Sequence, residues 1–337
     1  MSRALDASVK KALKYGNHKE VFEQIAAVLS DNHDGYLEIE VLPTSHRLDE
    51  DVYVLQDGEH IGVHKLRLVQ AFLHARQIFN KSLLHDKSIH NKTVEGATAV
   101  ILLMDSEHLT AANARKRLLA SGFASDAERR EKLMHELFIM NSFLRSRLYR
   151  HTKSPVLWNH KRWLLRQQKQ AGIPINLRHE FDRVICVAAE RHPRNYYAWT
   201  YARDVIASAH TTQERDGQVA EQILPVIEKW CRLHHQDISG WSFLLHLVLL
   251  FPSKAPEVFD NTLSLAEMFK WRNESVWHFL KNMALMLARK TDAAREKRFL
   301  DVWTALRRDV GNDGNPDAKV LDRVTDWIGL QTKSPMY

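Results

Sequence analysis

The sequence contains few of the residues that interrupt helices or cross-link chains. Of 337 residues, 12 are glycine, 9 are proline and 2 are cysteine. Scarce glycine and proline favour long helices over tight turns and strands. The two cysteines, Cys186 and Cys231, are too few for a disulfide framework, which excludes the class of small cross-linked secreted domains. This usage indicates a reducing compartment.

Long apolar runs and targeting signals are lacking as well. Met1 is followed by Ser-Arg-Ala-Leu-Asp, which contains no apolar signal core. The longest apolar stretch, 241–251, is interrupted by Ser242 and His246 and is too short to cross a bilayer. The final Ser-Pro-Met-Tyr offers no cysteine for lipidation. We therefore expect a soluble, cytoplasmic protein without a membrane span.

Neither sign of charge dominates the chain. It carries 48 basic and 41 acidic residues, interspersed, for a net charge of +7. Such a mild excess permits contact with phosphates, nucleic acid or an acidic partner but selects none of them. Because nothing else in the sequence favours nucleic acid, we do not expect it as a partner. Apolar content of 45% and charged content of 26% are ordinary for a soluble globular protein.

A tryptophan motif recurs through the second half of the chain. In each copy a serine, asparagine or aspartate stands four residues before the tryptophan, as in the pairs Ser154–Trp158, Asn195–Trp199, Asp237–Trp241 and Asn273–Trp277. Side chains of these types cap helix N-termini, and Pro155 suits a first helical position. The tryptophans follow one another at 41, 42 and 36 residues. A repeat of this length is one helix pair, which buries its apolar face by stacking on its neighbours.

The rest of the chain extends this organisation. Residues 1–63 hold a helix within 1–30, and then an alternating pattern that ends at Asp57-Gly58, which indicates either a β-hairpin or an irregular cap. Residues 64–330 form the predicted helical repeat domain, and 331–337 a disordered tail. Between and after the tryptophan helices we expect helices at 177–191, 213–234, 255–270, 293–310 and 318–328. The predicted fold class is all-α.

The motif carries a family resemblance. Asn195-Tyr196-Tyr197-Ala198-Trp199, followed by Arg203, resembles the Asn-Tyr-x-x-Trp repeat of protein prenyltransferase α subunits. An earlier copy keeps the frame with Asn113 in place of tryptophan, so that motif and period span about 94–289. The chain is most similar to the divergent branch, the α-subunit repeat-containing proteins. This resemblance implies a right-handed α-α superhelix that pairs with a separate β subunit.

Some positions depart from the family pattern. Pro155 stands where the motif has tyrosine. The arginine four residues after the tryptophan is kept as Arg162 and Arg203 but becomes Leu245 and Lys281 in the last two copies. The last two repeats are therefore candidates for a purely structural role.

Two cations lie directly before predicted helix starts. Lys153 precedes Ser154 and Arg194 precedes Asn195. A cation at the positive end of a helix dipole is mildly unfavourable, but an anion bound there is met both by the cation and by free backbone N–H groups. Stacked repeats would place the two starts on one rim, where a diphosphate could contact both. The alternative is that both are solvated surface cations.

The resemblance assigns roles to these residues. Lys153 stands five residues before Trp158, where the family has the lysine that reaches the isoprenoid diphosphate and stabilises the leaving group. Arg194, Tyr196 and Tyr197 are the implied substrate-binding residues. Zn²⁺ and the isoprenoid diphosphate would belong to the β subunit. The tryptophans are predicted to be core, and Cys231, His234 and His235 do not supply a tetrahedral zinc site.

The sequence leaves three functions open. The leading hypothesis is an α-like subunit, inactive alone, of a heterodimeric enzyme that transfers a geranylgeranyl group to a cysteine near the C-terminus of a protein substrate. A second is a non-catalytic, tetratricopeptide-like scaffold, although the 34-residue period of that repeat is absent. A third is an adaptor that binds a β subunit and only presents substrates.

Overall fold

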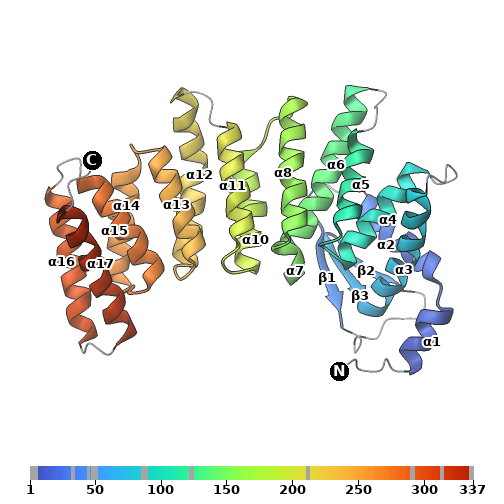
Figure 1. The fold of residues 1–337 in the computed structure, drawn as a ribbon, viewed down its shortest axis with the longest axis horizontal. Coiled ribbons are helices and arrows are strands. Elements are labelled where there is room, and N and C mark those ends of the chain that lie inside the picture. The colour runs from blue at the N-terminus through green and yellow to red at the C-terminus, as the bar shows by residue number, and fades with distance from the viewer. Residues whose placement is uncertain are drawn as a thin grey trace. The chain divides into compact units, whose positions relative to one another are not determined.

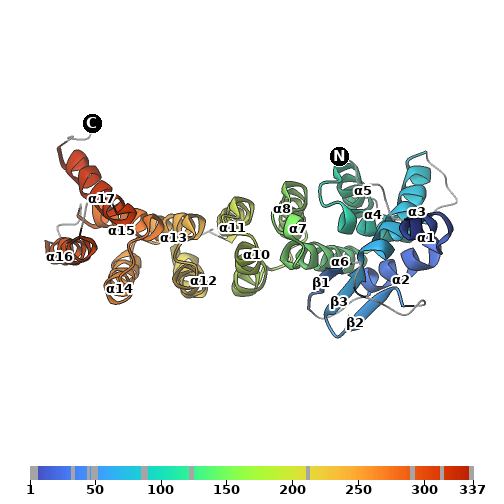
Figure 2. The same ribbon diagram turned by 90° about the horizontal axis from the view of Figure 1, so that it is seen from below.

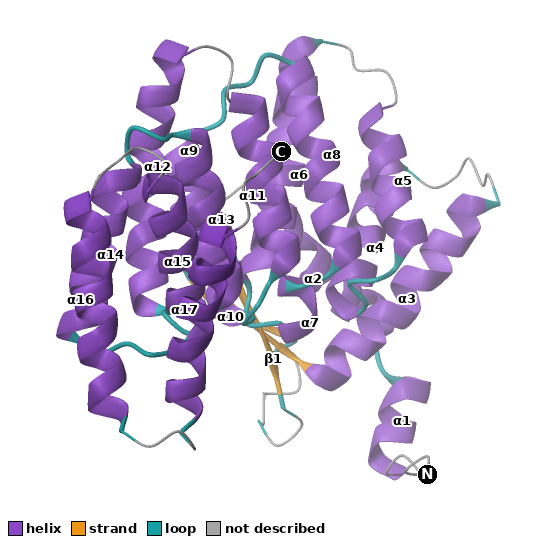
Figure 3. Ribbon diagram, turned by 60° about the vertical axis from the view of Figure 1, so that its left-hand side comes forward, coloured by secondary structure: helices purple, strands orange, loops and turns teal. Residues whose placement is uncertain are grey.

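A computed structural model describes residues 7–31, 35–43, 46, 52–84, 90–120, 125–209, 213–288, 293–311 and 315–333. Within these ranges the regular structure is helical apart from one small sheet near the N-terminus (Figure 3). The predicted all-α, helical-repeat fold is thereby confirmed. The chain divides into two compact units, one of residues 1–176 and 187–204 and the other of 177–186 and 205–337.

The first unit contains the sheet and the helices around it (Figure 1). Its elements are α1 (Ala7–Tyr15), α2 (His18–Ser30), β1 (Glu38–Leu42), β2 (Val54–Asp57), β3 (His60–His64), α3 (Lys65–Leu83), α4 (Asn91–Met104), α5 (Leu109–Ala120), α6 (Asp126–Arg145), α7 (Tyr149–Thr152) and α8 (Pro155–Gln170), with most of α10 (Cys186–Arg191) and of α11 (Tyr196–Ala209). The sheet and the helices that follow it therefore belong to the same compact unit.

The sheet has the strand order β1-β3-β2. β2 and β3 form an antiparallel hairpin with Val54 opposite Val63, and Gly58 in its turn has a φ of 57° that suits glycine. β1 adds in parallel, with Ile39 opposite Ile61. Of the two alternatives left open for this region, the hairpin is correct, and the parallel third strand was not predicted.

The second unit is built from helix pairs. Its elements are α9 (Leu177–His179), a π-helical segment η1 (Glu180–Ile185), α12 (Gln213–Leu233), α13 (Ile238–Leu250), α14 (Ala255–Met268), α15 (Glu274–Ala288), α16 (Ala293–Val310) and α17 (Pro316–Lys333). Figure 2 shows α13, α15 and α17 in one layer and α12, α14 and α16 in the other. Of the predicted tail, residues 331–333 continue α17, and residues 334–337 lie outside the described residues.

The four tryptophans lie in the core, each with no more than 1% of its surface exposed. Three indole N–H groups donate to a backbone carbonyl six residues earlier: Trp158 to Thr152 at 2.8 Å, Trp241 to His235 at 3.0 Å and Trp277 to Trp271 at 2.7 Å. Each such bond joins the helix to the turn that precedes it. Each of these tryptophans therefore packs in the core and also holds the turn before its helix in place.

The predicted helix starts agree with the structure, since α8, α11, α13 and α15 begin one residue after Ser154, Asn195, Asp237 and Asn273. The Ser154 hydroxyl accepts from the N–H of Leu157 at 3.1 Å, and the Asp237 carboxylate from that of Ser239 at 2.8 Å. These bonds satisfy N–H groups that a helix start leaves open. Asn273 differs, because its side-chain oxygen lies 3.1 Å from His235 Nδ1.

Gly240, near the start of α13, lies where that helix meets α12, and replacing it should destabilise the second unit. A Cβ atom at Gly240 would lie 2.2 Å from Trp230 Cζ3. Trp230 is buried, and its indole donates to the Cys186 carbonyl at 3.1 Å, so the ring has little freedom to move. We expect Gly240→Ala to lower the free energy of unfolding by ~1–3 kcal/mol in denaturant titrations followed by circular dichroism.

Gly217, in α12, supplies the matched control. A Cβ atom there would meet nothing within 4 Å, so Gly217→Ala should stabilise the helix by up to about 1 kcal/mol. Equal stability of the two variants would mean that α12 and α13 do not approach as closely at Gly240 as this geometry requires.

Candidate functional site

The first unit brings together the ends of α7, α8 and α11. Lys153 is the single residue between α7 and the Ser154 cap of α8, and Arg194 directly precedes the Asn195 cap of α11. The Ser154 hydroxyl also donates to the Ser106 carbonyl at 3.0 Å, and this bond holds the start of α8 against the segment between α4 and α5. Both cations thus lie at well-fixed helix starts.

Asn195 links the two helix starts directly. Its side chain is fully buried and donates to the Thr152 carbonyl at 2.6 Å and to the Ala188 carbonyl at 3.2 Å, while its oxygen accepts from the N–H of Ala198 at 3.3 Å. The Thr152 carbonyl therefore receives both Asn195 and Trp158. Lys153 follows Thr152 and Arg194 precedes Asn195. The two cations are therefore the chain neighbours of the two residues that this hydrogen bond joins.

The same link occurs once more, in the second unit. Asn273 donates to the His235 carbonyl at 2.7 Å, and that carbonyl also receives the indole of Trp241. The asparagine of one repeat thus bonds the turn that precedes the previous tryptophan helix. From sequence we assigned Asn195 and Asn273 to capping alone, and the link between repeats was missed.

Exposed side chains surround the first of these links. Tyr196 is 54% exposed, Tyr197 43% and Tyr149 66%, whereas Lys153 is half-buried and Arg194 exposed. Tyr149 of α7 stacks on His192 with ring centroids 4.2 Å apart, a second contact between the two segments. We call Tyr149, Lys153, Arg194, Tyr196 and Tyr197 the α7–α11 rim. It combines two cations with three aromatic rings.

The charge of the position five residues before the tryptophan differs between the repeats. Five residues before the tryptophan the four copies carry Lys153, Arg194, Gln236 and Arg272. Gln236 is neutral, and Arg272 lies 3.7 Å from the Asp309 carboxylate. Among the described residues Lys153 has no ion pair. The first two positions therefore place a lysine and an arginine on the rim.

Arg194 adopts a backbone conformation that an arginine rarely takes. Its φ is 56°, in the left-handed region that favours glycine. Holding a residue with a Cβ atom there costs about 1 kcal/mol or somewhat more, and such conformations concentrate at functional positions. Glycine would fit this backbone better than arginine.

We expect Arg194→Gly to leave the free energy of unfolding within about 1 kcal/mol of wild type, because relief of the left-handed conformation offsets the greater freedom of glycine in the unfolded chain. Arg194→Ala keeps the conformation and should be the less stable of the two. Both should bind inorganic diphosphate more weakly than wild type in calorimetric titrations. A glycine variant as unstable as the alanine variant would show that the side chain serves the fold.

A buried charged cluster lies elsewhere in the first unit. Arg115 of α5 donates to both oxygens of Glu136 of α6, at 2.6–3.1 Å, and His160 Nε2 of α8 lies 2.9 Å from Glu136 Oε1. Burial raises the pKa of Glu136, but Arg115 and His160 outweigh burial and hold it well below its ordinary value. These side chains are at most 4% exposed, and the cluster joins three helices.

Another buried histidine lies between the rim residues Tyr149 and Lys153 in the sequence. His151 of α7 is 6% exposed, and its Nε2 lies 2.9 Å from the Leu102 carbonyl. Burial lowers the pKa of His151 to about 4, although that carbonyl opposes the effect. His151 is therefore neutral near pH 7, and it adds no positive charge to the two rim cations.

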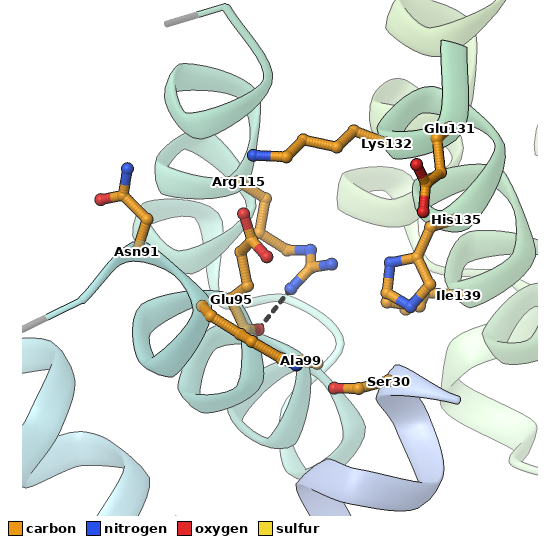
Figure 4. A pocket seen from close by; sticks show the side chains of 10 residues that line it. Ser30, Asn91, Glu95, Ala99, Arg115, Glu131, Lys132, His135 and Ile139 are labelled. Atoms are coloured by element: carbon orange, nitrogen blue, oxygen red, sulfur yellow. Dashed lines mark hydrogen bonds between the residues drawn. The ribbon is translucent and has the colours of Figure 1, made fainter. Parts of the chain in front are cut away.

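A cavity of about 360 Å³ opens between α4, α5 and α6 (Figure 4). Arg115 lies at its wall and donates to the Glu95 carbonyl at 2.6 Å. Its lining carries Lys92, Arg115 and Lys132 together with Glu95 and Glu131, so charges of both signs are present. This cavity does not include the rim.

The described residues contain no group of three or more histidine, cysteine, aspartate or glutamate side chains arranged to hold a metal ion. No described helix is both long and apolar enough to cross a bilayer.

Comparisons with known proteins identify relatives of the repeat. A family model described as the ECM9 middle domain matches residues 157–269. This segment includes Trp158, Trp199 and Trp241 but not Lys153. Protein prenyltransferase alpha subunit repeat-containing protein 1 of Danio rerio is 25% identical over 192 residues, which are 51% of this chain and 42% of the relative.

Two other relatives extend the comparison. Protein prenyltransferase alpha subunit repeat-containing protein 1-A of Xenopus laevis is 25% identical over 211 residues, 57% of this chain and 46% of that protein. Geranylgeranyl transferase type-2 subunit alpha of Candida albicans is 25% identical over 120 residues, 35% of this chain and 32% of that protein. The chain spans less than half the length of each of these curated relatives.

Proposed function

Since the chain is a divergent relative of the proteins named for prenyltransferase α-subunit repeats, we propose that it is the α-like subunit of a heterodimeric protein prenyltransferase. In this proposal a separate β subunit carries Zn²⁺ and the isoprenoid diphosphate. The pair acts in the cytoplasm and transfers a geranylgeranyl group to a cysteine near the C-terminus of a protein substrate. The observation that carries the proposal is the α7–α11 rim, where Lys153 and Arg194 flank one hydrogen bond.

The chemistry assigned to this chain is electrostatic. As the bond between the isoprenoid and its diphosphate breaks, negative charge builds on the departing diphosphate. Lys153, joined by Arg194, would stabilise that charge. Tyr196 and Tyr197 would contact substrate through exposed hydroxyl groups. The β subunit supplies the metal chemistry, so this chain needs no nucleophile of its own.

The choice of a geranylgeranyl group rests on relatedness. The Candida albicans relative is named as a geranylgeranyl transferase subunit, and its match covers a third of this chain. The two vertebrate relatives carry names that state the repeat and no reaction. The proposal of a C20 donor therefore follows from the fungal relative.

Co-expression with candidate prenyltransferase β subunits tests the proposal. We expect one β subunit to co-purify with this chain and the pair to transfer a labelled geranylgeranyl group to a cysteine-bearing protein. If no β subunit forms a stable complex, the proposal fails. Donor diphosphates of C15 and C20 in parallel reactions distinguish farnesyl from geranylgeranyl transfer.

A non-catalytic adaptor is the second candidate, and the last two repeats favour it. Leu245 and Lys281 replace the arginine that the first two repeats keep as Arg162 and Arg203. An adaptor would bind the β subunit and present substrates without supplying charge to the diphosphate. A complex whose turnover is insensitive to the rim cations would identify this role.

A further inference from the structure

The N-terminal sheet reaches the segments that carry the rim. Glu38 begins β1, and its carboxylate pairs with two arginines: Arg145 at 3.0 Å and Arg191 at 2.8 Å. Arg145 is the last residue of α6, which leads through α7 to Lys153. Arg191 is the last residue of α10, three residues before Arg194. One carboxylate thus holds both chain segments that lead to the rim cations.

Several neighbouring contacts fix Glu38 itself. The backbone N–H groups of Leu37 and Ile39 donate to the hydroxyls of Ser142 and Ser146 on α6, at 3.0 and 3.3 Å. The guanidinium of Arg145 lies over the Tyr36 ring, 4.2 Å from its centroid. On its other edge β1 pairs with β3. The carboxylate is therefore presented by a strand with little freedom to move.

Glu38 is the negative charge in the group that it forms with Arg145 and Arg191. The three side chains are only 12–22% exposed, so water screens them weakly. Burial lowers the pKa of Arg145, Glu38 opposes this, and the neighbouring Arg191 lowers it further. If the carboxylate were removed, two partly buried cations would face each other, and their repulsion would push the ends of α6 and α10 apart.

We propose that Glu38 is a positioning residue, which sets the spacing of Lys153 and Arg194 by pairing with Arg145 and Arg191 at once; this inference rests on the proposed function. The N-terminal sheet then holds the anion-binding rim in place. The contact between α8 and α11 does not substitute for it, because Arg162 of α8 and Asp204 of α11 pair at 2.5 Å with both side chains more than a third exposed.

The test compares Glu38→Gln with Asp204→Asn in the full chain. Hydrogen exchange is measured by mass spectrometry over residues 149–154 and 191–196, which include the two helix starts. We expect Glu38→Gln to speed exchange roughly tenfold in both segments, and Asp204→Asn to leave both near wild type. Adding Arg191→Gln to Glu38→Gln removes one repelling cation and should restore part of the protection. Unchanged exchange in Glu38→Gln would overturn the inference.

Affinity for inorganic diphosphate separates positioning from stability. We expect Glu38→Gln to weaken binding about three- to tenfold, and Asp204→Asn to leave it unchanged. Faster exchange with unaltered affinity, in a chain whose affinity falls on Lys153→Ala, would reduce Glu38 to a structural role and overturn the inference. If Lys153→Ala leaves the affinity unchanged, the proposed function fails instead, and exchange alone then decides whether Glu38 holds the rim.

Discussion

Glu136→Gln is expected to destabilise the first unit by ~3–5 kcal/mol, because it leaves the buried Arg115 guanidinium without an opposing charge. Arg115 is 2% exposed and directs three of its donor contacts at Glu136. Glutamine keeps the shape of the side chain but offers one oxygen and no charge. Equilibrium unfolding in denaturant, read by the fluorescence of the buried tryptophans, measures the loss.

Glu128, on the same helix, provides the control. It pairs with Lys132 at 3.7 Å, and both side chains are about 40% exposed. Surface pairs of this kind are worth at most about 1 kcal/mol, so Glu128→Gln should be close to wild type. Similar losses for Glu136→Gln and Glu128→Gln would show that the buried cluster does not carry the stability assigned to it.

The pH dependence of Glu136 gives a second measurement. Its pKa is depressed in the folded chain, so its contribution is fully present above the ordinary value of 4.5 and is lost as pH falls below that value. Glu136→Gln should therefore lose less stability than wild type between pH 4.5 and 3. A steeper acid loss in the variant would contradict the ionised state of Glu136.

Much of the helical architecture could be predicted from the sequence because its signals are local. A capping residue followed by a tryptophan four positions on marked the starts of α8, α11, α13 and α15 correctly. Partner helices such as α14 and α16 ended within two residues of their predicted bounds. Both signals depend on residues that are close together in the sequence, so they can be recognised without knowledge of the fold.

Contacts between distant segments could not be predicted in this way. His160 and Lys161 follow Trp158 on α8. Both are buried: His160 beside Glu136, and Lys161 5.6 Å above the centroid of the Tyr201 ring. Their burial follows from helices that cover α8 on more than one side, a fact that periodicity does not reveal.

The residues of the candidate site stay a prediction, and the contacts around them were not predicted. Lys153 was proposed from its distance to Trp158 and the family resemblance, and Arg194, Tyr196 and Tyr197 from the equivalent place in the next repeat. The hydrogen bond from Asn195 to Thr152 joins residues 43 positions apart, and the pairs of Glu38 with Arg145 and Arg191 join residues 107 and 153 positions apart. No pattern within a single repeat encodes these contacts.

Lys153→Ala should lower the rate of prenyl transfer by about 100-fold in a reconstituted complex with the β subunit, because one preorganised cation is lost where charge develops. The loss should fall mainly on kcat, since the diphosphate gains charge as its bond to the isoprenoid breaks. Lys153 is half-buried and has no ion pair among the described residues, so its removal leaves no unpaired partner. Single-turnover rates with labelled isoprenoid diphosphate measure the change.

Lys169, at the opposite end of α8, is the matched control. It is exposed and belongs to the same helix, so Lys169→Ala removes an equal charge far from the rim and should turn over like wild type. Both variants should still co-purify with the β subunit. Lys153 stabilises the charge of the diphosphate, whereas the tryptophan core, which neither variant changes, supports assembly. If Lys153→Ala assembles and transfers the isoprenoid at the wild-type rate, the rim does not act on the leaving group, and the chain is an adaptor.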